Sequence, residues 1–164
     1  MNRLASLGAR MANRVLRHAG VEVRRLPQEP PSIFANFPDV EPWVATIIER
    51  VRPFTMTSLL RISALCHATR YVARAEVPGD IAECGVWRGG SMMAVALTLL
   101  AEGDLRHLDL YDTFGGMPPP KAVDRSVKSG RSAASVLEDA DKSSNVWAIA
   151  TLDEVRSNLE STVY

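Results

Sequence analysis

The sequence predicts an α/β fold built around a parallel β-sheet, and three segments carry this prediction. Residues 80–84 form a short apolar run before a glycine cluster, residues 91–101 are apolar on almost every side, and residues 107–111 form a second apolar run. A strand, a glycine loop, a helix and a second strand within about 30 residues make a βαβ unit, whose two strands are parallel. Because a doubly wound sheet needs about five strands, we expect the N-terminal portion of a Rossmann-like fold.

The composition excludes several classes of protein. The 164 residues are 46% hydrophobic and 23% charged, as in soluble globular proteins. A formal net charge of zero provides no field that would attract nucleic acid, and no apolar run approaches the roughly 20 residues of an integral membrane segment. Cys66 and Cys84 stand among apolar neighbours without metal-ligand spacing, which predicts reduced core thiols in a cytoplasmic protein.

Residues 1–32 are predicted to form a basic N-terminal arm and a linker, ahead of a domain at 33–164. Six arginines and one acidic residue lie in 1–26, which leaves 13 basic and 18 acidic residues in the rest of the chain. A narrow apolar stripe recurs there at helical spacing: Leu4, Leu7, Met11 and Val15. Such a helix could bind an anionic membrane or act as a transit peptide, but the absence of aromatic residues from the stripe favours packing on a partner subunit or fraying. The proline-rich residues 26–32 are the linker.

Two helices are expected before the glycine cluster. The first covers residues 41–51, has Pro42 in its first turn, and buries one apolar face formed by Val44, Ile47, Ile48 and Val51. The second begins at Thr57 or Ser58, either of which can cap it, and runs to about Ala75. Its buried stripe is expected to contain Leu59, Ile62, Cys66, Thr69 and Val72 with Ala73.

The region after Asp112 begins with a long loop that contains three consecutive prolines. A loop of this length in a compact domain is typical of a lid over a site. A short helix is expected at 132–139, and residues 145–150 are expected to form a brief strand or a covering segment. Thr151 and Glu154 have the spacing of a capping box, which predicts a final helix through about Ser161.

The residues ECGVWRGGS at positions 83–91 lie where the first strand ends, the position at which open α/β sheets bind ligands. Gly85 permits a tight turn and a close approach of the backbone to a ligand. Gly89 and Gly90 begin the next helix, so their N–H groups are expected to face the crevice. The spacing is not that of a dinucleotide fingerprint. The carboxylate of Glu83 would repel a phosphate and would suit a cation, such as the amino group or the sulfonium of S-adenosylmethionine.

Asp112 ends the second strand, 27 residues after Gly85, which suits hydrogen bonds to ribose hydroxyls. Phe114 is placed to pack on an adenine face. Trp87 and Arg88 are interpreted as residues that shape the loop or are exposed, and not as ligand contacts. A glycine turn that serves packing alone is the structural alternative, and an NAD-linked oxidoreductase is an enzymatic alternative weakened by the missing third glycine.

Three segments in order, VPGDIAECGVWRGGSMM, LYDTFGGMPPP and VWAIATLDEVRSNLEST, resemble the macrocin O-methyltransferase (TylF-type) family, as does PFTMTSLLRISAL before them. The resemblance covers roughly residues 40–164. It implies an S-adenosylmethionine-dependent methyltransferase that acts on a small-molecule hydroxyl, notably on a sugar of a natural product, with a divalent metal that is usually Mg²⁺. It also implies cofactor contacts at the matching positions, which are Glu83, Gly85, Gly89, Ser91 and Asp112, with Thr55 and Met56 at the border. The chain departs from the family at Gly115, where a glutamate is common.

In the family that the sequence resembles, the metal ligands and the general base lie on later strands than this chain contains. The sequence therefore predicts no catalytic residue and no metal ligand here, and Mg²⁺ is expected only in a complete family member. The alternative function is a catalytically inactive, truncated cofactor-binding module or relic. An incomplete sheet would expose an apolar edge, so a homo-oligomer is expected.

Overall fold

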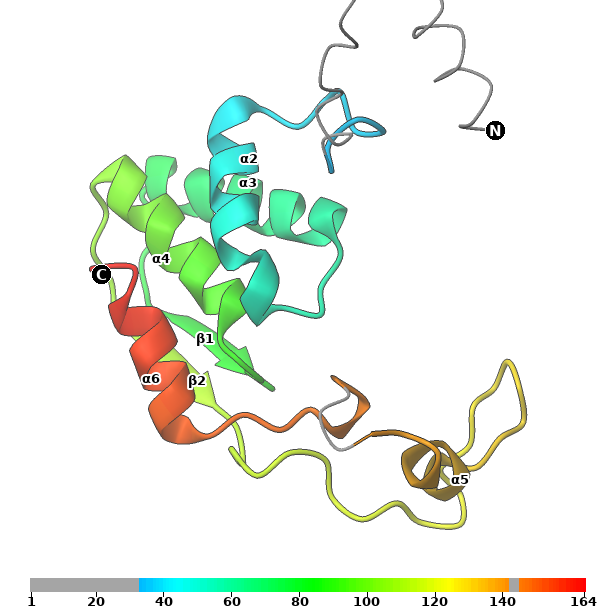
Figure 1. Cartoon of the computed structure of the whole chain (residues 1–164). Helices are drawn as coiled ribbons and strands as arrows, with labels where there is room; N and C mark the ends of the chain where they lie inside the picture. The colour runs from blue at the N-terminus through cyan, green and yellow to red at the C-terminus, as the bar shows by residue number, and fades with distance from the viewer. Residues whose placement is uncertain (1–32, 142–144) are drawn as a thin grey trace, which may run out of the picture. The chain divides into compact units, whose positions relative to one another are not determined.

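The fold is described from a computed structural model that places residues 33–141 and 145–164 (Figure 1). The chain divides between Pro38 and Asp39 into two units, and the helices and strands of the described residues belong to the second. The arm and the linker predicted over 1–32 lie outside the described residues. The domain boundary at residue 33 stays a prediction.

The two predicted lead-in helices are confirmed. Helix α2 (Pro42–Val51) has its proline in the first turn and buries all four residues of the predicted face. A short 3-10 helix, η2 (Arg52–Phe54), leads to α3 (Leu59–Arg74). Ser58 stands at the N-cap of α3, but its side chain makes no capping hydrogen bond. Of the predicted stripe of α3, Ile62, Cys66 and Thr69 are buried. The prediction is wrong for Leu59, Val72 and Ala73, which are only partly buried.

The predicted βαβ unit is also confirmed (Figure 1). Strands β1 (Ile81–Cys84) and β2 (Leu108–Tyr111) are parallel and adjacent, and Ile81 pairs with Leu108. Helix α4 (Gly90–Glu102) connects them and packs on one face of the sheet. It also packs against α2 and α3, which explains why its sequence is apolar on almost every side. Within the described residues the sheet has these two strands, as expected for the N-terminal portion of a Rossmann-like fold.

Side chains of β1 alternate between the α4 face and an open face of the sheet. Ile81 and Glu83 are partly buried on the α4 side, whereas Ala82 and Cys84 are exposed. The prediction that both cysteines are core thiols is therefore right for Cys66 and wrong for Cys84. The strand alternation, with a period of two, places Cys84 opposite to its neighbour Glu83.

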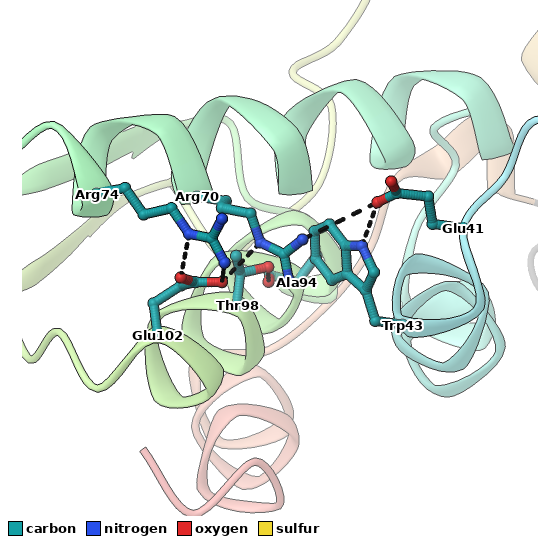
Figure 2. A network of polar contacts seen from close by, with 7 residues as sticks. All are labelled: Glu41, Trp43, Arg70, Arg74, Ala94, Thr98 and Glu102. Carbon is teal, nitrogen blue, oxygen red and sulfur yellow. Dashed lines mark hydrogen bonds and ion pairs between the residues drawn. The ribbon is translucent and has the colours of Figure 1, made fainter.

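A polar network that the sequence analysis did not anticipate joins the lead-in helices to α4 (Figure 2). The guanidinium of Arg70 lies over the ring of Trp43, 3.4 Å from its centroid, and its Nε donates to Glu102 at 2.6 Å. Nε of Arg74 donates to the other oxygen of Glu102 at 2.7 Å. Glu41 accepts from the indole of Trp43 and lies 3.9 Å from Arg70. The network holds α2, α3 and α4 together on the side of α4 that the sheet does not cover.

We expect Glu102→Gln to lower the melting temperature by a few degrees at neutral pH, because it removes the charge that both arginines share. Hydrogen bonds from Arg74 and Arg70, together with their charges, lower the pKa of Glu102 below its ordinary value of 4.5, although partial burial acts against them. A lowered pKa contributes stability above about pH 4.5 that is lost as the pH falls through the folded-state pKa. Thermal unfolding from pH 7 to pH 3 should show the difference between wild type and variant shrinking on the acid side. Glu49→Gln, which changes an exposed carboxylate of α2, is the control and should differ little from wild type at any pH.

The segment between β2 and the last helix contains α5 (Ala133–Glu138), whose N-cap Ser132 accepts from the N–H of Ser135. The strand that residues 145–150 could have formed is absent: Asn145–Trp147 is a 3-10 helix, and Ala150 covers Val86. Two alternatives were predicted for residues 145–150, a brief strand and a covering segment, and the structure shows the covering segment.

The final helix, α6 (Leu152–Glu160), begins as predicted at Thr151, whose side chain accepts from the N–H of Glu154 at 3.2 Å. The reciprocal half of the predicted capping box is wrong, because the carboxylate of Glu154 binds Arg88 of the glycine loop instead. A long-range ion pair has replaced a local cap. Among the described residues, no helix has the length and apolarity that crossing a bilayer requires.

Candidate functional site

The glycine loop between β1 and α4 depends on left-handed backbone conformations. Gly85 has φ +86° and Gly89 has φ +87°, values that residues with a side chain rarely adopt. The N–H of Gly85 donates to the carbonyl of Tyr111 at 2.9 Å and continues the parallel pairing one residue beyond β1. Gly89 then stands at the N-cap of α4. The predicted turn is therefore present at the carboxyl end of the sheet.

Asp112 binds this loop. Its Oδ2 accepts from the N–H of Val86 at 2.6 Å and of Trp87 at 3.1 Å, and its Oδ1 accepts from the N–H of Phe114 at 2.9 Å. Partial burial acts against the charge, but the N–H groups of Phe114, Val86 and Trp87 outweigh it, so that the pKa of Asp112 lies below its usual value. Oδ1 also accepts from the hydroxyl of Thr113 at 3.5 Å, so a ribose hydroxyl at this oxygen would replace that long hydrogen bond or share the carboxylate with it. A contact of Asp112 with ribose hydroxyls stays a prediction.

Glu83 lies on the α4 side of β1, close to Ser91 and Asp112. Its Oε2 is buried and has no hydrogen-bond partner among the described residues. Desolvation raises the pKa of Glu83, a hydrogen bond with Ser91 lowers it, and the charge of Asp112 raises it further. A buried carboxylate oxygen without a donor is costly unless a ligand supplies one. The arrangement therefore favours a ligand that brings a positive charge or an N–H group to Glu83.

Gly90 was predicted to contact the cofactor, but the structure gives it a packing role. It is buried, and a Cβ atom at this position would lie 2.5 Å from the carbonyl oxygen of Phe54 and 2.7 Å from Cβ of Thr55. Because Gly90 has no side chain, the segment after α2 can approach the first turn of α4. Whether its N–H also contacts a ligand stays a prediction.

Phe114, Thr55 and Met56 were also predicted to lie at the cofactor. Phe114 has φ +52° and packs against the apolar cluster formed by Val86, Ala150 and Val155. It also lines a groove of about 450 Å³ between β2 and α6. Its contact with an adenine stays a prediction, as do those of Thr55 and Met56.

Arg88 makes contacts that its position in the loop did not reveal. Its side chain binds Glu154 of α6 and the carbonyl of Pro53, and its own carbonyl accepts from Asn158. The interpretation of Arg88 as a loop-shaping residue is thus confirmed, whereas its partners could not be named because they lie 35 to 70 residues away.

A metal site does not emerge from the described residues, which contain no cluster of three or more His, Cys, Asp or Glu side chains suited to hold an ion. Cys66 is buried beneath α4, where desolvation raises the pKa of its thiol. Ligand binding at Glu83, Ser91 and the glycine loop stays a prediction.

Comparisons with known proteins bear on this site. A model of the macrocin O-methyltransferase (TylF) family matches residues 49–160. The 8-demethyl-8-(2,3-dimethoxy-alpha-L-rhamnosyl)-tetracenomycin-C 4'-O-methyltransferase of Streptomyces olivaceus is 40% identical over 79 residues, which are 45% of this chain and 30% of that protein. The mycinamicin III 3''-O-methyltransferase of Micromonospora griseorubida is 38% identical over 66 residues, which are 39% of this chain and 26% of that protein. Among solved structures, the O-methyltransferase NovP is similar with a TM-score of 0.44 and 27% identity, over 66% of this chain and 42% of that one. The chain spans less than a third of the length of both curated relatives.

Proposed function

Because the chain belongs to the macrocin O-methyltransferase (TylF) family, we propose that it forms the S-adenosylmethionine-binding part of an O-methyltransferase. The acceptor in this proposal is a small-molecule hydroxyl, on a sugar of a natural product. The names of both curated relatives specify O-methylation, one of them of a rhamnosyl derivative and the other of mycinamicin III. These names support a sugar hydroxyl as the acceptor class. They do not specify the molecule to which the sugar is attached.

One observation carries the proposal: the buried Oε2 of Glu83 has no partner among the described residues, at the carboxyl end of β1. The amino group of S-adenosylmethionine is a cation that would supply the missing donors. Gly85, two residues further along the chain, leaves open space at the loop, since a Cβ there would meet no atom within 4 Å. The residues present therefore fit this cofactor, with Glu83, Gly85, Gly89 and Ser91 around its methionine end and Asp112 and Phe114 toward its nucleoside.

The bound cofactor would supply an electrophilic methyl group, and the residues of this chain would bind and orient it. The described residues hold no donor set that suits Mg²⁺, which takes carboxylates in octahedral geometry. Magnesium dependence is accordingly proposed only for a protein that adds further donors, and no step is assigned to a metal here.

A cofactor-binding module without activity is the second candidate. Measuring methyl transfer to a sugar hydroxyl alongside cofactor binding separates the two, because the module would bind without turnover.

A cytoplasmic location is part of the proposal and is supported by two cysteines that form no disulfide. Association of copies is also proposed, supported by the exposed Cys84 and by Tyr111, 60% exposed on β2.

We expect the full chain to bind S-adenosylhomocysteine in isothermal titration calorimetry, and Glu83→Gln to weaken binding about tenfold or more at pH 7.5. A hydrogen bond between two charged groups contributes about 1.5–3 kcal/mol, which corresponds to this change. The affinity of the wild type should also fall as the pH is lowered through the pKa of Glu83, which lies above 4.5, because only the ionised carboxylate attracts the amino group. The affinity of Glu83→Gln should depend little on pH over the same range.

The same variant should leave the ligand-free protein as stable as the wild type or more stable near neutral pH. A carboxyl group with a raised pKa costs stability once the pH rises through that pKa, and glutamine removes the cost. Glu160→Gln, an exposed change on α6, is the matched control and should bind like the wild type. Equal affinity of Glu83→Gln and wild type at pH 7.5 would show that Glu83 does not receive the ligand's amino group.

A further inference from the structure

Arg88 joins the glycine loop to two segments that are distant in sequence. Its Nε donates to Oε1 of Glu154 on α6 at 2.5 Å, and its Nη1 donates to the carbonyl of Pro53 at 3.0 Å. Two different nitrogens of one guanidinium thus bind two different segments at the same time. The side chains of this ion pair are about one-third exposed, at 36% for Arg88 and 34% for Glu154.

The backbone of Arg88 is held as well. Nδ2 of Asn158, one turn after Glu154 on α6, donates to the carbonyl of Arg88 at 2.9 Å. The guanidinium also lies 5.4 Å from the ring centroid of Phe54 and 5.8 Å from that of Trp87, distances at which a cation is attracted to an aromatic ring. Both ends of the residue are therefore fixed against α6 and η2.

The residues tied in this way flank the proposed cofactor site. Pro53 and Phe54 precede Thr55, which packs within a few ångströms of Gly90 at the start of α4. On the other side, Val155 of α6 approaches Gly89, where a Cβ would lie 3.4 Å from its Cγ1. A shift of η2 or of α6 would therefore move the first turn of α4, and Ser91 with it.

We propose that Arg88 is a positioning residue for cofactor binding, which holds the Val86–Gly89 turn and the first turn of α4 in the geometry that the ligand requires. The inference rests on the proposed function and adds a residue to it. Arg88 acts through the loop, since its guanidinium is engaged by Glu154, Pro53 and Phe54. Lysine cannot replace it fully, because one ammonium on a flexible stem lacks the planar fork that reaches two acceptors in fixed directions.

The test measures the affinity of the full chain for S-adenosylhomocysteine by calorimetry, at a temperature well below the melting temperature of each variant. We expect Arg88→Ala to weaken binding about tenfold, a change in the range found for residues that act on a site without touching the ligand. Arg88→Lys should recover part of the affinity, since it keeps the charge near Glu154. Glu154→Gln should fall between Arg88→Lys and the wild type, because its carbonyl still accepts from the guanidinium.

Arg156→Ala is the matched control, because it removes an arginine of α6 whose ion pair with Asp153 is exposed. It should bind within twofold of the wild type.

A lower melting temperature with unchanged affinity in Arg88→Lys and Glu154→Gln would make Arg88 a structural residue only and would overturn the inference. These two milder variants decide the matter even where Arg88→Ala does not fold. No binding by the wild type would refute the proposed function and this inference together, whereas binding by the wild type with equal affinity in all variants would refute this inference alone.

Discussion

Asp112→Ala is expected to lower the melting temperature of the ligand-free protein by roughly 5–10 °C. The substitution removes the acceptor of three backbone N–H groups, those of Val86, Trp87 and Phe114. Hydrogen bonds to a charged acceptor contribute about 1.5–3 kcal/mol each in favourable settings. Because the loop is near solvent and water can replace part of this, we expect a total loss of about 2 kcal/mol. Circular dichroism during heating measures it.

The effect should depend on pH in a definite direction. The pKa of Asp112 is lowered in the folded protein from its ordinary value of 3.8. The carboxylate therefore contributes stability above about pH 4 that is lost as the pH falls through the folded-state pKa. The gap between wild type and Asp112→Ala should be largest near neutral pH and should narrow in acid.

Asp109→Ala, on the strand that ends directly before Asp112, is the matched control. Its carboxylate lies near the exposed His107 on the open side of the sheet, 3.2 Å from Nε2. We expect little change in melting temperature for this variant. If Asp112→Ala melts at the same temperature as Asp109→Ala, the clamp on the glycine loop contributes nothing to stability. Weaker cofactor binding by Asp112→Ala could come from a distorted loop or from the loss of the proposed ribose contact. The melting temperature of the ligand-free protein is therefore the decisive measurement for the hydrogen bonds from Asp112 to the loop.

The elements of this fold were predictable because each is encoded by a local pattern. The apolar face of α2 recurs at helical spacing, and all four of its residues are buried. The two strands and the connecting α4 follow from apolar runs on either side of the glycine cluster, and the observed parallel pairing is what such a unit requires. Thr151 was predictable as a cap for the same reason, because its partner is three residues away.

The partners of the polar side chains were not predictable. The sequence places Asp112 at the end of β2 but does not show what its carboxylate binds. Trp87 and Phe114 have positive φ angles, and their N–H groups donate to this carboxylate. These backbone conformations were not predictable from the sequence. Glu154 fits a capping box locally, yet the guanidinium of Arg88 is the stronger partner because it offers a full charge. The network around Glu102 arises from three helices that only the tertiary structure brings together (Figure 2).

Glycine is ambiguous in the same way, because a sequence shows that a side chain is missing without showing what occupies the space. Gly85 and Gly90 were both predicted to serve the cofactor. The structure distinguishes their surroundings: Gly85 has a positive φ and open space where a Cβ would lie, whereas a Cβ at Gly90 would meet the backbone of Phe54 and the side chain of Thr55. A pair of alanine substitutions turns this difference into opposite expected results.

Gly90→Ala is expected to destabilise the protein by about 3 kcal/mol, near the upper end of the range for an added methyl group in a packed site. The new Cβ would lie 2.5 Å from the carbonyl oxygen of Phe54 and 2.6 Å from its carbonyl carbon. These are backbone atoms, so relief requires η2 to move away from α4. Gly85→Ala adds a side chain at φ +86° with no atom within 4 Å, which costs only about 1–2 kcal/mol. Thermal unfolding of the two variants measures the difference.

Binding of S-adenosylhomocysteine should follow the reverse order. Gly85→Ala adds a methyl group to the open space at Gly85, where the proposed cofactor would approach the loop, so its affinity should fall at least tenfold although the protein remains folded. Gly90→Ala, measured at a temperature where it is folded, should lose less affinity, because its methyl group points toward Phe54 and Thr55. Stronger destabilisation by Gly85→Ala, or stronger loss of binding by Gly90→Ala, would contradict the packing role of Gly90 and the proposed cofactor role of Gly85. The expected pattern would separate the glycine that admits a ligand from the glycine that lets two segments of the chain pack.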